Sequence, residues 1–258
     1  MNEERLQRIS GTYQKRARVP FSRDSHVVLL LLSDGAWIPG VRIDSASFPL
    51  SIPATLNAVS TAWALDRTDV VVLWSNRSLT RAELLYAEDA FPGHSPRRHA
   101  DHVLIYGKTP VPEPRTELIP TIRHSGGASR DLIPVVRTVA KRAHVPSSRF
   151  PVGCIIPVGN GLAVPGVNVE HPEWPWILCA ERNALGTLVS YGLSEPDTLI
   201  LSCLRDDEGT PCGACRQLIM ELAPGASVWM DRGNRPPDCM EAVSMLPYFF
   251  TGRALTPD

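Results

Sequence analysis

The chain has 258 residues, of which 43% are hydrophobic and 21% are charged, a composition typical of an ordinary soluble globular protein. A net charge of −1 provides no field that would favour a nucleic acid or an anionic membrane as a partner. The N-terminal segment "MNEERLQRIS" lacks the apolar core of a signal peptide, and the longest aliphatic run is far shorter than the roughly 20 residues that span a bilayer, so we expect a cytoplasmic protein.

In the first half of the chain, the residue pattern predicts alternating helices and strands. The stretch "IPATLNAVSTA" (52–62) has the alanines and spaced aliphatic residues of a helix, and its proline suits the first turn. The aliphatic run "DVVVLWSN" (69–76) is typical of a buried strand. A helix that closes on Pro-Gly is predicted at 79–93, and the aliphatic segment "VLIY" (103–106) follows it.

The unit predicted from either half is the same, and the second half shows its elements in full. Helices are predicted at 130–144, 179–191 and 212–223, with a further short helix near the C-terminus. Strands are predicted at 151–158, 162–168, 197–203 and 226–230. Because strands alternate with helices, the sequence predicts an α/β layered unit.

The two halves repeat each other at an offset of 126 residues. "KRARVPFSR" (15–23) and "KRAHVPSSR" (141–149) differ at two of nine positions. Over 15–62, 16 of the 48 residues are identical to their partners in 141–188. Chance would give only a few such identities, so the sequence indicates an internal duplication.

Weaker matches extend the repeat and predict the domain boundaries. "VLIY" aligns with "SVWM" (227–230), and "TELIP" (116–120) echoes "VSMLP" (243–247). We therefore expect a first domain at 1–122, a linker "RHSGGAS" at 123–129 and a second domain at 130–258.

Three of the six cysteines form a pattern typical of a metal site. All six lie in the second half, which suggests metal binding rather than disulfides in a chain without an export signal. Cys179, Cys212 and Cys215 stand at predicted helix starts, where unpaired N–H groups stabilise thiolates. Three protein ligands leave the fourth position of a tetrahedral zinc to water, whose pKa the metal lowers towards neutrality. Glu181 is then available to move protons, and Arg182 could offset the thiolate charge.

The sequence resembles the cytidine deaminase family along nearly the whole second half. "CAE" followed by "PCGAC" matches the zinc deaminase pattern of a Cys-x-Glu and a later Pro-Cys-x-x-Cys. The matching segments, in family order, are "PSSRFPVG" (146–153), "GVNVE" (166–170), "CAERNA" (179–184), "PCGACRQ" (211–217) and "MLPYFF" (245–250). The resemblance implies two tandem three-layer α/β/α units, each with a mixed sheet of about five strands. It also implies hydrolytic deamination of cytidine or deoxycytidine in pyrimidine salvage.

The resemblance also implies roles for individual residues of the second domain. Cys179, Cys212 and Cys215 match the family's zinc ligands, which implies one Zn²⁺ per chain, and Glu181 matches its proton shuttle. The resemblance places Asn168 and Glu170 at the ribose and Phe150 in the pyrimidine pocket. It places Phe250 where the family often has an aromatic ring stacked on the base, sometimes from a neighbouring subunit, and Arg182 where it offsets the thiolate charge.

Several alternatives stay open on the sequence. A structural zinc with Cys203 or His171 as the fourth ligand would leave Glu181 and the ribose pair unexplained. Directly after the ribose-binding glutamate the family usually carries Asn-Ala, where this chain has a His-Pro pair, so another cytosine nucleoside, such as a nucleoside antibiotic, is an alternative substrate. A nucleic-acid-editing deaminase would need a basic groove, and a non-catalytic zinc-stabilised interaction protein would not need the glutamate. Trp174 and Trp176 are expected at a domain or subunit interface.

The first domain lacks the reactive residues. At the zinc-ligand positions, Pro53 aligns with Cys179, Thr80 with Cys212 and Glu83 with Cys215. Thr55 aligns with Glu181, and Arg42 and Asp44 align with Asn168 and Glu170. We therefore expect 1–122 to be a degenerate, non-catalytic cytidine-deaminase-like unit. Single-domain relatives are commonly tetramers, so the fused pair is expected to form a homodimer with the same four-unit arrangement. In that dimer the first domain would shape the partner's pocket.

Overall fold

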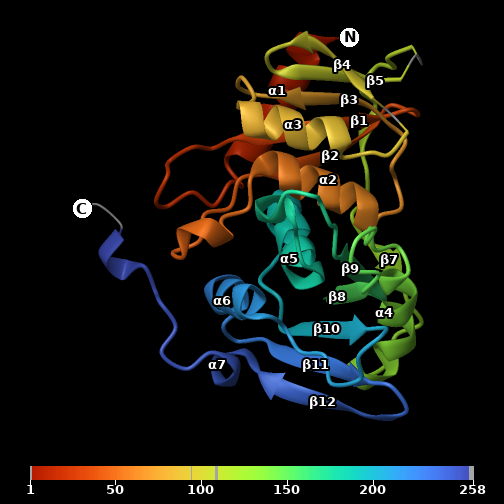
Figure 1. The fold of residues 1–258 in the computed structure, drawn as a ribbon, viewed down its shortest axis with the longest axis vertical. Helices are drawn as coiled ribbons and strands as arrows, with labels where there is room; N and C mark the ends of the chain where they lie inside the picture. The colour runs from red at the N-terminus through yellow and green to blue at the C-terminus, as the bar shows by residue number, and fades with distance from the viewer. Residues whose placement is uncertain (1, 94, 108–109, 256–258) are drawn as a thin grey trace.

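Each half of the chain forms one six-stranded mixed sheet with helices packed on it (Figure 1). The structure is a computed structural model that describes residues 2–93, 95–107 and 110–255. Two helices, α2 (Ala54–Ala64) and α5 (Ala180–Tyr191), lie between the two sheets in Figure 1. In the described part of the chain, no helix has both the length and the apolar character needed to cross a membrane.

The N-terminal sheet has the strand order β4-β5-β3-β1-β2-β6. Its strands are β1 (Val27–Leu32), β2 (Ala36–Val41), β3 (Val70–Ser75), β4 (Pro96–Ala100), β5 (Val103–Tyr106) and β6 (Thr116–Glu117). The helices of this half are α1 (Glu3–Gln14), the 3-10 turn η1 (Phe48–Leu50), α2 and α3 (Arg81–Asp89). Both β1 and β3 are buried along their whole length, as their continuous apolar runs predict.

The C-terminal sheet has the strand order β12-β11-β10-β8-β9-β7. Its strands are β7 (Ile122–Arg123), β8 (Val152–Gly159), β9 (Leu162–Val167), β10 (Thr198–Cys203), β11 (Ser227–Arg232) and β12 (Arg235–Glu241). The helices are η2 (Ser129–Leu132), α4 (Ile133–Ala140), η3 (Trp174–Trp176), α5, α6 (Gly213–Leu222), α7 (Ala242–Met245) and η4 (Arg253–Leu255).

The predicted α/β class is confirmed, and each sheet has six strands rather than about five. The strands that the pattern did not predict are β4, β6, β7 and β12. β6 and β7 have two residues each, and β4 ("PRRHA") and β12 ("RPPDCME") are polar edge strands that are mostly exposed. Since edge strands of this kind carry prolines and charges and bury no alternating face, hydrophobic periodicity does not reveal them.

The strands at 103–106 and 227–230 take the same place in the two sheets, next to β3 and next to β10, but they run in opposite directions. β11 runs parallel to β10, with α6 as the crossover that a parallel pair requires. β5 instead runs antiparallel to β3, because the chain leaves α3 through the edge strand β4 and returns as a hairpin. The echo of "TELIP" in "VSMLP" fails, since the first segment begins with strand β6 and the second lies in and after helix α7.

Residues 122–123 already belong to the C-terminal sheet. As β7 they pair antiparallel with β9, with Ile122 opposite Ala163 and Arg123 opposite Leu162. The next amide, of His124, donates to the carbonyl of Gly161 at 2.8 Å. The last residue of the expected first domain and the first two of the expected linker are therefore bound to the second sheet, which favours a boundary a few residues earlier, between β6 and β7.

Contacts between α2 and α5 join the two halves in symmetry-related pairs. The Asn57 Nδ2 donates to the Gly186 carbonyl at 3.2 Å, and the Asn183 Nδ2 donates to the Ser60 carbonyl at 2.9 Å. Between them the hydroxyls of Thr61 and Thr187, 126 residues apart, lie 2.8 Å from each other. A shift of 126 residues relates the Asn57–Gly186 contact to the Asn183–Ser60 contact. Such pairs of equivalent contacts are the pattern of a two-fold interface and support the duplication. Both helices are almost completely buried, so neither shows a polar face in the sequence.

Candidate metal centre and active site

Three cysteine sulfurs meet where α5 and α6 begin. Cys179 caps α5, Cys212 caps α6, and Cys215 lies in the first turn of α6. The Sγ atoms of Cys179 and Cys212 are 3.8 Å apart, those of Cys212 and Cys215 are 3.6 Å apart, and all three lie within 4.8 Å of one another. The fold therefore brings together the three cysteines that the sequence placed at helix starts.

The geometry and chemistry of this group fit a zinc ion. In a tetrahedral site with Zn–S bonds of ~2.3 Å, two sulfurs are about 3.8 Å apart, close to the separations seen here. Hydrogen bonds from the other two thiols lower the pKa of Cys212, and backbone N–H groups at the start of α6 act in the same direction. The Nε of Arg182, which is buried on α5, has no hydrogen-bond partner among the described residues. A buried cation with a free donor, three residues after Cys179 on the same helix, suits a site that carries net negative charge.

The cysteines and Glu181 line one cavity of about 190 Å³. Its lining residues are Phe150, Val152, Asn168, Cys179, Glu181, Leu201, Cys203, Thr210, Cys212 and Cys215. Glu181 lies in the first turn of α5 and is 3% exposed. Burial raises the pKa of its carboxyl to about 7, so this group can both accept and release a proton near neutral pH.

Asn168 and Phe150 lie at this cavity, and the two residues brace each other. The Asn168 Nδ2 donates to the Phe150 carbonyl at 2.9 Å, and its Oδ1 accepts from the Val152 backbone N–H at 2.8 Å. These bonds fix the start of β8 against the end of β9. The amide of Asn168 thus holds the segment that carries Phe150 at the cavity wall.

Glu170 and Phe250 are not among the residues that line this cavity. The Glu170 carboxylate accepts from the backbone N–H groups of Ser147 and Ser148, at 2.9 and 3.1 Å. Burial alone would raise the pKa of Glu170, but hydrogen bonds from the Ser148 side chain and from the Ser148 and Ser147 backbones outweigh it and lower the pKa. Phe250 is 53% exposed, and its carbonyl accepts from the Gln217 side chain at 2.8 Å, which ties the C-terminal tail to α6.

Three residues of the cavity lining had no site role in the sequence, namely Val152, Leu201 and Thr210, and Cys203 had one only in the alternative of a structural zinc. Thr210 directly precedes the Pro-Cys-x-x-Cys segment, so its position in the motif was a usable signal. Val152, Leu201 and Cys203 lie in strands, where the sequence does not tell which residues face a cavity. Within the residues that the structure describes, neither Cys203 nor His171 joins the group of three sulfurs, so no fourth cysteine or histidine closes it.

The unusual loop 171–177 packs against the N-terminal half. The ring of Trp176 stacks on that of Tyr86 in α3, with centroids 4.7 Å apart and an angle of 15°. His171, which is buried, lies 5.2 Å from the same tyrosine ring, and its Nδ1 accepts from the Glu173 backbone N–H. The expected interface position is confirmed for Trp176, whereas Trp174 is 85% exposed. His171 thus serves the contact between the halves.

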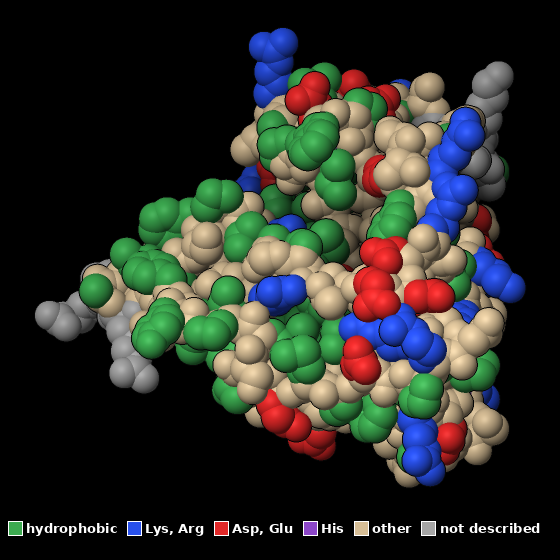
Figure 2. All heavy atoms as spheres, turned by 60° about the horizontal axis from the view of Figure 1, so that its bottom comes forward, with side chains coloured by type: hydrophobic (Ala, Val, Ile, Leu, Met, Phe, Trp, Pro, Cys, Tyr) green, Lys and Arg blue, Asp and Glu red, His purple; other side chains and the backbone are tan. Residues whose placement is uncertain are grey.

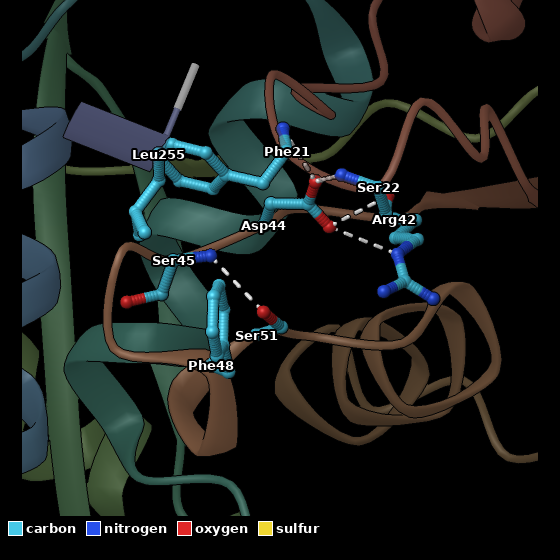
Figure 3. A pocket seen from close by; sticks show the side chains of 8 residues that line it. All are labelled: Phe21, Ser22, Arg42, Asp44, Ser45, Phe48, Ser51 and Leu255. Carbon is cyan, nitrogen blue, oxygen red and sulfur yellow. Dashed lines mark hydrogen bonds and ion pairs between the residues drawn. The ribbon is translucent and has the colours of Figure 1, made fainter. Parts of the chain in front are cut away.

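In the N-terminal half, Asp44 is held as its counterpart Glu170 is. Its carboxylate accepts from the backbone N–H groups of Phe21 and Ser22, at 3.2 and 2.7 Å, and these residues precede Ser147 and Ser148 by 126 positions. Figure 3 shows Asp44 beside a cavity of about 310 Å³, with Arg42 donating to the same carboxylate at 2.9 Å. Arg42 stands where the C-terminal half has Asn168, so in the N-terminal half the Asp44 carboxylate is paired with a cation.

The N-terminal counterpart of the metal site is filled by a buried polar cluster. His26, Ser75 and Glu83 are all less than 5% exposed. The His26 Nε2 lies 2.8 Å from the Ser75 Oγ, and its Nδ1 lies 3.3 Å from a Glu83 oxygen. The guanidinium of Arg77 also donates to Glu83, at 3.1 Å. Glu83, aligned with Cys215, thus takes part in an ion-paired cluster within protein.

Comparisons with known proteins cover part of the chain. The model of the cytidine and deoxycytidylate deaminase zinc-binding region matches residues 128–230. A cytidine deaminase of Mycoplasma genitalium is 34% identical over 93 residues, which is 36% of this chain and 71% of that protein. One of Halalkalibacterium halodurans is 35% identical over 113 residues, 42% of this chain and 83% of that protein. The crystal structure of cytidine deaminase from Burkholderia pseudomallei is 29% identical, has a TM-score of 0.43 and covers 46% of this chain and 97% of that one.

Proposed function

The chain belongs to the cytidine deaminase family, and on this premise we propose that its C-terminal half hydrolyses cytidine or deoxycytidine to uridine or deoxyuridine and ammonia. One observation carries the proposal: a buried glutamate, Glu181, shares a cavity with three cysteine sulfurs that lie within 4.8 Å of one another. A metal bound by cysteine sulfurs can activate water, and a nearby carboxyl whose pKa is close to neutral can transfer protons. Together they suit the hydrolysis of an amidine-like C–N bond.

We propose that Cys179, Cys212 and Cys215 hold one zinc ion. When bound, zinc supplies a water that ionises near neutral pH and so acts as a nucleophile towards C4 of the pyrimidine. The cluster that fills the equivalent place in the N-terminal half supports a single ion per chain, because that half presents no comparable group of cysteine, histidine or acidic ligands among its described residues.

Glu181 is the proton carrier in this proposal. Its carboxylate accepts the proton that the attacking water gives up and delivers it to N3 of the ring. As the C4–N4 bond breaks, Glu181 takes the remaining proton from the hydroxyl on C4 and gives it to the amino group, which leaves as ammonia while the oxygen stays on C4 as the carbonyl. The raised pKa of Glu181 supports this role, because a carboxyl of ordinary pKa would release a proton too readily to reprotonate an amine.

Phe150, Asn168 and Glu170 are proposed to bind the nucleoside. Phe150 lines the cavity next to the cysteines, which suits a wall against the flat pyrimidine ring. Asn168 and Glu170 lie two positions apart on the segment after β9, and hydrogen bonds with backbone groups fix both side chains. Fixed amide and carboxylate groups suit the hydroxyls of a ribose.

Purified protein mixed with cytidine tests the proposal. We expect the ultraviolet band of cytidine to decrease as uridine forms, and a zinc chelator to abolish the reaction. If the protein binds zinc stoichiometrically but consumes neither cytidine nor deoxycytidine, the proposal fails. A panel of other cytosine nucleosides then tests the alternative substrate, and binding of single-stranded DNA at low salt tests the editing alternative.

We further propose that two chains form a homodimer. Phe48, Tyr248 and Phe250 are exposed apolar residues, and Leu255 of the tail lines the same cavity as Phe48. Figure 2 shows hydrophobic side chains gathered beside the C-terminal end of the chain. We call Phe48, Tyr248, Phe250 and Leu255 the tail surface. Its apolar character supports burial against a second copy, from which Phe250 would reach a pocket that it does not line in its own chain.

A further inference from the structure

Loop 45–51 of the N-terminal half contacts both helices that carry the cysteines. On α5, the Arg182 Nη2 donates to the carbonyl of Leu50 at 2.9 Å. On α6, the carboxylate of Glu221 accepts from the Ser45 hydroxyl at 2.9 Å and from the Ala46 backbone N–H at 3.2 Å. One short loop of the half without cysteines is therefore bonded to both elements that form the sulfur group.

The loop is braced internally. The backbone N–H of Ser45 donates to the Ser51 hydroxyl at 3.1 Å, a bond drawn in Figure 3, and that of Ser47 donates to the Ser45 hydroxyl at 3.2 Å. The Leu50 N–H donates to the Ser47 carbonyl at 2.8 Å, which fixes the turn η1. A loop whose polar groups are bonded to one another holds the Leu50 carbonyl in one place.

In the part of the chain that the structure describes, the opposite side of the two-fold interface lacks these bonds. Leu56 stands 126 residues before Arg182, so α2 has no guanidinium at this position. Asp89 of α3, which aligns with Glu221, lies 4.0 Å from the Nε2 of His171, which aligns with Ser45. Among the described residues, the loop is therefore bonded to the neighbouring helices by close polar contacts on the side where the cysteines are, whereas on the opposite side loop 171–177 packs on α3 mainly through aromatic rings.

We propose that loop 45–51 is a positioning segment of the metal centre, which fixes Arg182 through the Leu50 carbonyl and α6 through Glu221. The inference rests on the proposed function, in that the three cysteines must hold a metal. Arg182 is 7% exposed and its Nε has no partner among the described residues, so the Leu50 carbonyl sets the direction of a buried guanidinium three residues after Cys179. Groups just outside the ligands commonly change metal affinity in this way.

Zinc affinity of purified variants, measured by competition with a chromogenic chelator, tests the inference without reference to activity. Glu221→Ala removes the loop's contact with α6, and we expect about a tenfold loss of zinc affinity. Arg182→Met, which keeps length but removes charge and donors, should lose at least as much. The fold-loss of zinc affinity in the double variant should be clearly smaller than the product of the two single fold-losses, because both substitutions remove contacts with the same loop.

Asp89→Ala is the matched control, since it removes the aligned carboxylate on the side without cysteines. We expect its zinc affinity to equal that of the wild type. If Glu221→Ala and Asp89→Ala change zinc affinity equally, or if the losses in the double variant simply multiply, the positioning role is wrong. A wild type that binds zinc but does not deaminate cytidine contradicts the proposed function alone, whereas a wild type that binds no zinc contradicts both.

Discussion

One carboxyl group, that of Glu181, combines a position at a helix start with nearly complete burial. In the first turn of α5 it shares the cavity with the sulfurs, and burial raises its pKa to about 7. At the same position of the N-terminal half stands Thr55, which is also buried. A hydroxyl has the same access to the interior but no proton to exchange near neutral pH, which accounts for the difference between the halves at the level of one residue.

Replacing Glu181 with glutamine tests its role in proton transfer. Glutamine keeps the shape of the side chain but cannot carry a proton, so kcat/KM for cytidine should fall by about 10²- to 10⁴-fold. Zinc content, measured by atomic emission, should stay at the wild-type value, because the three cysteines are untouched. Turnover close to that of the wild type would show that another group moves the protons.

Glu83 in the N-terminal cluster makes stability depend on pH. Burial alone would raise its pKa, but hydrogen bonds from His26, Arg77 and the Thr80 backbone outweigh it and lower the pKa to about 2, against an ordinary value of 4.5. A carboxyl whose pKa falls on folding stabilises the native state above its unfolded pKa, and this contribution is lost as the pH falls from about 4.5 towards 2.

The stability difference between wild type and Glu83→Gln should therefore depend on pH. We expect it to be constant above pH 5 and to shrink by about 1 kcal/mol by pH 3.5, measured by urea unfolding. Ser78→Ala, an uncharged change at an exposed position nearby, should show a difference that does not vary with pH. A Glu83→Gln difference that stays constant over this range would contradict the lowered pKa.

At the scale of elements, close contact between β9 and α5 sets where the first cysteine lies. A Cβ added at Gly166 would lie 2.2 Å from the Ala180 carbonyl and 2.5 Å from the Ala184 backbone nitrogen. The absence of a side chain at this position allows the start of α5, with Cys179 as its cap, to approach the sheet. Gly40 faces Ala54 and Ala58 of α2 in the same way, so this packing is common to both halves.

Gly166→Ala should therefore disturb the metal site through the helix. The clash with backbone atoms should lower the free energy of unfolding by about 1–3 kcal/mol and also weaken zinc binding, because α5 must move away from β9. Gly213→Ala is the control, since a Cβ at that position, between two of the cysteines, would meet nothing within 4 Å. Thermal unfolding and chelator competition measure both effects. Equal losses in the two variants would contradict the packing argument.

For the whole molecule, the internal two-fold interface leaves the tail surface exposed. The contacts between α2 and α5 already pair the two halves within one chain. The exposed apolar residues of the tail surface lie elsewhere, on η1 and on the segment after α7. Two chains joined through that surface would contain four units, two of them with cysteines.

Light scattering should therefore give the mass of two chains. Tyr248→Glu, which places a charge in the tail surface, should shift the protein towards the monomer, because a buried charge without a partner opposes association. Ile119→Glu alters an exposed apolar residue on the segment that links the halves and should leave the dimer intact. A monomeric wild type, or a dimer that tolerates Tyr248→Glu, would contradict the proposed assembly.

Metal analysis of the purified chain tests whether only the C-terminal half binds zinc. We expect one zinc per chain in the wild type and none in Cys212→Ser, because two thiolates and a hydroxyl form a much weaker site. Removal of zinc by a chelator should lower the melting temperature, since a metal bound by the native state stabilises it by mass action. Two zinc ions per wild-type chain would show that the N-terminal half also binds metal.

Sequence alone was sufficient for the α/β class and for the placement of Cys179, Cys212, Cys215 and Glu181 at helix starts, because periodicity and motif spacing are local properties of the chain. It did not predict the reversed direction of β5 or the polar edge strands β4 and β12, since nothing in a short exposed strand records which neighbour it pairs with.

Only the tertiary structure showed which residues of the two halves meet. His171 was an unexplained departure in the sequence, and the fold packs it against Tyr86 of α3. Phe250 was expected at the base, and the fold places it outside the cavity of its own chain, with its carbonyl bonded to Gln217. The contacts of Leu50 with Arg182 and of Ser45 with Glu221 join residues more than 130 positions apart. Local pattern determines the element on which a residue lies, whereas packing over such distances along the chain decides what that residue touches.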